Sequence, residues 1–182
     1  MASTSDTSGL HGGTGCGACD NKSGCRVRLI RERFTGPERL VGLGFRCWLA
    51  GFDTGDIDCW ETGWRVFAGD LGPQLAKGTV TDLACWVRAI STSSCRKIEY
   101  YPVSCAEFCR DECLGVSIIA ACQQHACPVL ESCATALLGC ERIGEVVRTA
   151  KDFANTLENA NIRLGNHILA HAGQLTSQHD GA

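Results

Sequence analysis

The chain lacks the long hydrophobic runs that membrane-spanning helices require, because charged or strongly polar residues interrupt every stretch of leucine, valine and isoleucine. It also lacks a basic excess: its 182 residues carry a formal net charge of -3, which argues against a dedicated nucleic-acid-binding protein. Residues 1–20 contain neither the basic nor the apolar segment of a secretory signal. We therefore expect a cytoplasmic protein, with neither a membrane nor a nucleic acid as its partner.

Most familiar metal-binding motifs are also missing. The chain has a single CxxC, formed by Cys16 and Cys19, with Cys25 six residues further on, whereas a structural zinc site typically pairs two such motifs. There is no ferredoxin-type run of closely spaced cysteines and no CxxCH for covalent haem. Any iron–sulfur cluster would have to take its ligands from distant positions in the sequence.

Cysteine itself is abundant, with 14 residues in the chain. In a reducing cytoplasm this number does not indicate seven disulfides, and a disulfide-rich extracellular domain is the less favoured alternative. We therefore expect each thiol to be buried, to bind a metal or to be reactive.

Three segments differ in composition. Residues 1–24 are rich in glycine and small polar residues and are predicted to form a flexible arm that carries two of the cysteines. Residues 25–172 show apolar residues spaced three or four apart, and strand-type alternation is scarce. We predict a single helical domain there, an all-α compact bundle of about five to six helices, followed by a frayed tail at residues 173–182.

The boundaries of several helices follow from their capping residues. Thr54 or Asp56 can cap a helix that contains Trp60 and Trp64, and Pro73 is well placed in the first turn of the next one. Ser104 and Glu107 have the spacing of a capping box. The other predicted helices span residues 37–50, closed by Gly51, residues 104–123, a segment starting at Pro128, and residues 141–172.

The strongest cysteine pattern lies in the predicted helix 104–123. Cys105, Cys109 and Cys113 recur every four residues, so on a helix they share a sector about 80° wide that also carries apolar residues. Their sulfurs are therefore expected to face the interior of the bundle. More cysteines follow, and they could present a second row of sulfur to the first. The predicted metal ligands are Cys105, Cys109, Cys113, Cys122, Cys127, Cys133 and Cys140.

A second pattern is a cysteine followed by tryptophan, at Cys47, Cys59 and Cys85. Adjacent helical residues point about 100° apart, so the simpler interpretation is that one member of each pair packs while the other lies near an interface. The alternative is that the three sulfurs converge on one cofactor site shielded by indole rings.

Histidine offers weaker signals. His167 and His171 lie one turn apart, a common spacing that favours a partly buried or capping role over metal binding. His125 lies two residues before Cys127 and could activate that thiol, although this is not a recognised catalytic spacing.

In composition, as a small helical protein with CxxxC spacing and inward thiols, the chain resembles the bacterial copper storage proteins. It departs from them in having fewer cysteines per helix and more tryptophan. Since soft thiolates suit iron–sulfur centres and Cu(I), we predict a metal-binding protein for electron transfer, sensing or metal handling, and not an enzyme by itself.

Two alternatives remain open. One is a thiol redox switch or oxidoreductase-like protein in which exposed cysteines such as Cys16, Cys19 and Cys25 cycle. The other is an interaction subunit whose cysteines are structural. For the metal-binding function and for both alternatives, a protein partner is expected to dock on a basic segment formed by Arg26, Arg28, Arg31 and Arg33.

Overall fold

The computed structural model describes residue 34 and residues 36–176, and its regular structure is entirely helical. The all-α prediction is therefore confirmed. The predicted arm, the basic segment and the last six residues lie outside the described part of the chain. The helices are α2 (Gly36–Thr54), α3 (Ile57–Leu71), α4 (Pro73–Ser93), α5 (Arg110–Gln123), α6 (Cys127–Leu138), α7 (Gly144–Asn159) and α8 (His167–Thr176).

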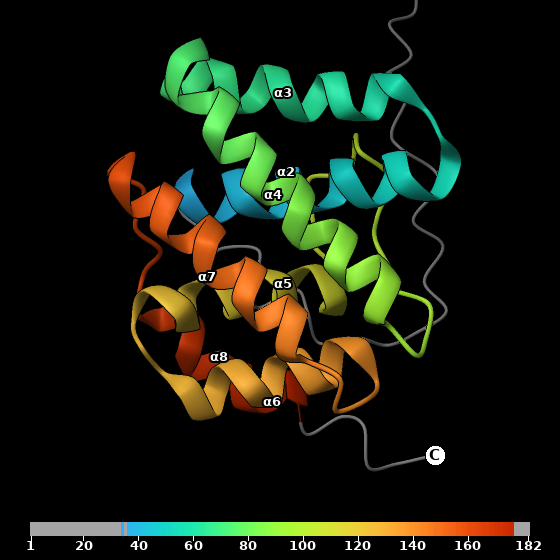
Figure 1. The fold of residues 1–182 in the computed structure, drawn as a ribbon, viewed down its shortest axis with the longest axis vertical. Coiled ribbons are helices and arrows are strands. Elements are labelled where there is room, and N and C mark those ends of the chain that lie inside the picture. Colours follow the sequence, from blue (N-terminus) through green and yellow to red (C-terminus); the bar gives the residue numbers. More distant parts are fainter. Residues whose placement is uncertain (1–33, 35, 177–182) are drawn as a thin grey trace, which may run out of the picture.

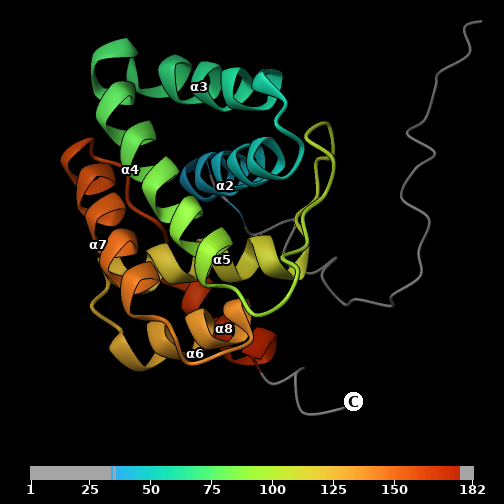
Figure 2. The ribbon, with the colours of Figure 1, turned by 45° about the vertical axis from the view of Figure 1, so that its right-hand side comes forward.

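The helices pack in a layered order that both views show (Figures 1 and 2). Helix α3 lies at one end, followed by α2, then α5, with α6 and α8 at the opposite end, and α4 and α7 lie side by side across one flank. Helix α5 contacts α2, α6, α7 and α8. No helix among the described residues is long and apolar enough to cross a membrane.

Helix α5 is the centre of the core. Its residues from Asp111 to Cys122 are all buried, which is the pattern of a helix surrounded by other helices. Consequently, a sulfur on α5 is buried whichever face of the helix carries it.

Two of the predicted helix starts are confirmed. Asp56 caps α3, its carboxylate accepting a hydrogen bond from the Asp58 amide at 3.0 Å, and Pro73 is the first residue of α4. The predicted end of the helix 37–50 is wrong, because Gly51 lies inside α2. A Cβ at Gly51 would lie only 2.2 Å from Nε1 of Trp60, so this glycine permits the close approach of α3 rather than ending α2.

The predicted helix 104–123 is also corrected, since it begins only at Arg110. Its capping box joins Cys109 and Glu112, whose carboxylate accepts a hydrogen bond from the Cys109 amide at 2.7 Å, and not Ser104 and Glu107. The buried Arg46 guanidinium donates to the carbonyl oxygens of Cys105, at 2.5 Å, and of Glu107. These tertiary hydrogen bonds hold residues 102–107 in an irregular conformation. Cys105, Cys109 and Cys113 therefore do not share a helical face.

The predicted long helix 141–172 is two helices, α7 and α8. Helix α7 ends at Asn159, and the connection that follows contains Asn161, which has a left-handed φ of 59°. The Gln123 side chain donates to the Ile162 carbonyl oxygen and accepts from the Leu164 amide, both at 2.9 Å. These two bonds give hydrogen-bond partners to backbone groups in the connection between the helices. Phe153 and Leu157 of α7, Leu164 of the connection and Ile168 of α8 are all buried, although they belong to no single helix.

The C-terminal boundary differs as well. Helix α8 continues to Thr176, so residues 173–176 are helical, although they were predicted to belong to a frayed tail.

Candidate functional site

Two cysteines from separate connections lie together at the surface. Cys95 follows the end of α4 and is exposed, and Cys140 follows the end of α6 and is half-buried. The Cys140 thiol lies 3.5 Å from the Ser93 carbonyl oxygen, to which it can donate. We call Cys95 and Cys140 the surface thiol pair.

The chain around Cys95 is attached to the end of α6. The Cys95 amide donates to the Leu138 carbonyl oxygen at 2.8 Å. Gly139 ends α6 with a left-handed φ of 68°, and a Cβ at this position would lie 3.3 Å from the Arg96 side chain, so the stem of Arg96 packs closely over the glycine. These contacts bring Cys95 next to Cys140.

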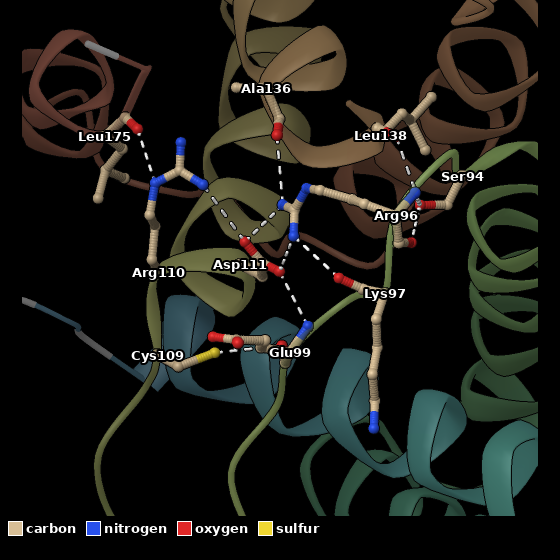
Figure 3. Close-up of polar contacts among 10 residues, drawn as sticks. All are labelled: Ser94, Arg96, Lys97, Glu99, Cys109, Arg110, Asp111, Ala136, Leu138 and Leu175. Carbon is tan, nitrogen blue, oxygen red and sulfur yellow. Dashed lines mark hydrogen bonds and ion pairs between the residues drawn. The ribbon is translucent and has the colours of Figure 1, made fainter. Parts of the chain in front are cut away.

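A polar network fixes the same segment to α5 (Figure 3). Arg96 donates from both terminal nitrogens to the two carboxylate oxygens of Asp111, each at 2.7 Å, and also to the Ala136 carbonyl oxygen at 3.2 Å. The same carboxylate accepts from the Glu99 amide at 2.8 Å. Because bidentate arginine–carboxylate pairs are geometrically specific, this network holds residues 94–99 in one place.

The electrostatic environment of the surface thiol pair favours a thiolate. The pKa of Cys140 is lowered, first by a hydrogen bond from the Cys95 side chain, and then by the backbone amide and guanidinium of Arg142. The Arg142 guanidinium also donates to the Cys95 sulfur at 3.2 Å. In turn, contact with Cys95 and Cys140 raises the pKa of Arg142.

The buried thiols have the opposite environment. Burial raises the pKa of Cys47 to about 11 and the pKa values of Cys122 and Cys133 to about 12. The pKa of Cys109 is raised further, by burial and by the charge of Glu112, and its thiol lies 3.2 Å from the Glu99 carbonyl oxygen. At neutral pH these thiols are protonated and only weakly nucleophilic.

The structure brings together only part of the predicted cofactor site. Cys47 on α2 is near enough to Cys59 on α3 for the Cys59 charge to contribute to the raised pKa of Cys47. Cys85 lies on the exposed face of α4, where its charge acts on Arg148 of α7, while its neighbour Trp86 is fully buried. The simpler interpretation of the cysteine–tryptophan pairs therefore describes α4.

The predicted metal ligands are also dispersed. Cys105 lies in the connection before α5, Cys109 caps that helix, and Cys113 and Cys133 are buried in α5 and α6. Cys122 and Cys127 are close enough to interact electrostatically across the α5–α6 turn, and Cys140 belongs to the surface thiol pair. Among residues 34 and 36–176, no three or more histidine, cysteine or acidic side chains are grouped so that they could hold a metal ion.

Sequence reasoning missed Cys95, and with it the surface thiol pair. The available signal was indirect: Cys95 directly follows the polar residues 91–94, and Cys140 lies between a glycine and Arg142. Each feature suggests an exposed turn, but neither shows that the two turns meet.

Fold and site together define a helical bundle, in the described part of the chain, with two neighbouring surface thiols, of which Cys140 has a lowered pKa. No protein-family model, curated protein or solved structure matches the chain.

Proposed function

We propose that the protein is a thiol redox switch, in which Cys140 is the reactive thiolate and Cys95 is the resolving thiol. The observation that carries the proposal is the placement of Arg142 and the Cys95 side chain around the Cys140 sulfur, where both stabilise its anionic form. Cysteines that sense oxidants are typically accessible, have a low pKa and lie beside a resolving thiol.

The proposed chemistry has two steps. The Cys140 thiolate attacks one oxygen of a hydroperoxide; the O–O bond breaks, hydroxide or alkoxide leaves, and Cys140 becomes a sulfenic acid. The Cys95 thiolate then attacks the Cys140 sulfur and the S–O bond breaks. The oxygen leaves as hydroxide and becomes water when it accepts a proton. The cysteines lose two electrons in total and the peroxide gains them.

The product would be a disulfide between the connection that follows α4 and the turn that follows α6. Because Arg96 and Asp111 already hold this connection against α5 and α6, the bond requires little additional ordering of the chain. Arg142 would lose its thiolate partner, so oxidation would change the local surface charge.

The test is to treat the reduced full-length chain with one equivalent of hydrogen peroxide and to map its peptides without reduction. We expect a Cys95–Cys140 disulfide as the first product. Cys140→Ser should abolish it, whereas Cys95→Ser should leave Cys140 as a sulfenic acid that dimedone labels.

Cys85→Ser is the matched control, because Cys85 is exposed and lies on α4, outside the surface thiol pair. The disulfide should form in this variant at the normal rate. Peroxide consumption that is equal in the Cys140→Ser and Cys85→Ser variants would contradict the proposal.

The second candidate is the predicted metal-binding function, placed at the same two thiols. Two thiolates are sufficient for a two-coordinate Cu(I) ion, and soft thiolate ligands select this metal. An iron–sulfur cluster needs about four ligands, so the surface thiol pair supports Cu(I) better. Both metal assignments stay predictions. An anaerobic Cu(I) titration against a competing chelator should show one site that Cys140→Ser removes and Cys85→Ser retains.

A cytoplasmic location would suit a reversible switch, since cytoplasmic thiol systems can reduce the disulfide. The interaction-subunit alternative, with docking on Arg26, Arg28, Arg31 and Arg33, also stays a prediction, because those residues lie outside the described part of the chain.

A further inference from the structure

A second group of thiols lines a hollow at the α5–α6 turn, apart from the surface thiol pair. The hollow has a volume of about 280 Å³, close to the lower end of the range of small-ligand pockets. Helix α5 and the turn form one side, the start of α6 another, and one face of α7 the third. Its lining residues are Ala121, Cys122, His125, Cys127, Leu130, Lys151 and Asn155.

The polar groups around the hollow favour an anionic ligand. Lys151 provides a positive charge, and no carboxylate is among the lining residues. The side chains of Lys151, His125 and Asn155 make no hydrogen bond or ion pair within the described chain, so all three are available to a ligand. Leu130, which is buried, gives the hollow an apolar wall.

The two thiols differ in accessibility. Cys127 is exposed at the first position of α6. Cys122 is buried at the end of α5. The turn between them is fixed by backbone hydrogen bonds from Ala126 to Ala121, at 2.9 Å, and from Cys127 to His125, at 3.1 Å.

We propose that this hollow is a modification site, at which Cys127 forms a stable mixed disulfide with a small thiol that carries carboxylates. Lys151 would pair with a carboxylate of the incoming molecule, while His125 and Asn155 offer hydrogen bonds to its polar groups. This site is separate from the surface thiol pair, so the two proposals can fail independently.

The reaction is a thiol–disulfide exchange. The Cys127 thiolate attacks one sulfur of the small disulfide, the S–S bond of that molecule breaks, and one small thiolate leaves. The S–S bonding pair leaves with the released thiolate while the Cys127 sulfur forms the new S–S bond, so the number of disulfide bonds is unchanged and no other oxidant is required.

Cys122 would release the ligand if it attacked the mixed disulfide to form a Cys122–Cys127 bond. Burial raises the pKa of Cys122 to about 12, so it is almost entirely protonated at neutral pH. Resolution is therefore slow and the mixed disulfide persists. The surface thiol pair differs, because there an exposed thiol is ready to complete an intramolecular disulfide.

The probe for the test is oxidised glutathione, a small disulfide with several carboxylates. The reduced full-length chain is incubated with it at pH 7.5, and adducts are quantified by intact mass and by peptide mapping over time. We expect one glutathionyl group on Cys127, formed about threefold to tenfold faster than on Cys85, which is also exposed. Cys85 is a suitable reference because its neighbour Arg148 is already paired with Glu145 at 2.6 Å.

Charge variants test the role of the hollow. Lys151→Gln should lower the Cys127 rate about threefold to tenfold, and added salt should diminish this difference. Lys77→Gln, a matched change at an exposed position of α4 outside the hollow, should leave the rate unchanged. His125 has a left-handed φ of 53°, so His125→Gly removes the imidazole without straining the turn.

Three results would overturn the proposal: equal rates at Cys127 and Cys85, equal effects of Lys151→Gln and Lys77→Gln, or a Cys122–Cys127 disulfide in place of the adduct. In Cys140→Ser the Cys127 adduct should still form. In the unsubstituted chain, absence of the peroxide-induced Cys95–Cys140 disulfide together with formation of the Cys127 adduct would reject only the switch proposed above. Formation of that disulfide without the Cys127 adduct would reject only the proposal for the hollow.

Discussion

The surface thiol pair and the buried thiols of α5 and α6 show how far the environment controls one kind of side chain. Cys140 lies beside a guanidinium, a backbone amide and a second thiol, and its pKa is lowered. Cys133 and Cys122 are buried, and burial raises their pKa values to about 12 despite the positive charges of Arg110 and Lys151 nearby. The number of cysteines in a chain therefore says little about reactivity until the neighbours of each sulfur are known.

The same comparison separates two structural roles. The buried thiols fill space in the core as small apolar groups, which agrees with the structural alternative for those residues. The surface thiol pair lies where two connections meet, with Cys95 exposed and Cys140 packed against the edge of the core. We expect substitutions of the first group to change stability and substitutions of the second group to change chemistry.

The largest expected effect comes from Glu112→Gln, which tests how much the buried ion pair at the start of α5 stabilises the fold. Glu112 and Arg46 form a fully buried ion pair at 2.5 Å, and neutralising the carboxylate leaves the guanidinium without its counterion. Urea denaturation should show a loss of about 3–5 kcal/mol in the free energy of unfolding. Glu61→Gln, which breaks an exposed pair with Arg65, should cost at most about 1 kcal/mol. Equal losses would contradict the central role of the buried pair.

Alkylation rates compare the two groups of thiols directly. At pH 7.5, a thiol with the raised pKa of Cys133 has roughly a thousandth of the thiolate of an ordinary cysteine. Iodoacetamide should therefore modify Cys140 at least about 10³-fold faster than Cys133 in the folded protein, as measured by peptide mass spectrometry. In urea the two rates should converge. Rapid modification of Cys133 by iodoacetamide in the native protein would show that the core does not exclude the reagent.

The pH dependence of stability should reveal the buried thiols as a group. Above about pH 9 the thiols of the unfolded chain ionise, whereas Cys122 and Cys133, whose pKa values are raised to about 12, stay protonated in the folded protein. The unfolded state then binds fewer protons, so the free energy of unfolding falls as pH rises, by up to about 1.4 kcal/mol per pH unit for each thiol. Cys133→Ala should reduce this slope, and Cys85→Ala, at an exposed position, should leave it unchanged.

The smallest expected effect is that of Arg142→Gln on the surface thiol pair. Removing the guanidinium should raise the pKa of Cys140, since one of the groups that lower it is lost. The pH profile of iodoacetamide modification should therefore move to higher pH, with severalfold slower reaction at pH 7. Arg148→Gln, which removes an exposed arginine paired with Glu145, is the control and should leave the profile in place.

Much of the fold could be predicted because local signals agree with the tertiary structure. The helical period, Asp56 as a cap and Pro73 at a helix start are all short-range features. Boundaries that depend on distant residues were missed. Arg46 binds backbone carbonyl oxygens before α5 and so keeps residues 102–107 out of that helix. Gln123 binds backbone groups of the connection between α7 and α8.

The candidate site was less predictable for the same reason. The sequence pointed to Cys140 as a metal ligand but gave no role to Cys95, because their contact depends on how two connections approach each other. The link between His125 and Cys127 was visible as a spacing, but the cation beside them comes from α7.

The sequence alone determined that the chain is helical and rich in thiols, because helical periodicity and composition are local properties. The tertiary structure decided which thiols have raised or lowered pKa values. A thiol's pKa depends on burial and on charges within a few ångströms, and those neighbours come from distant parts of the chain. For Cys140, whose pKa is lowered, the distant contributor is the Cys95 thiol, and for Cys122, whose pKa is raised, it is the surrounding core.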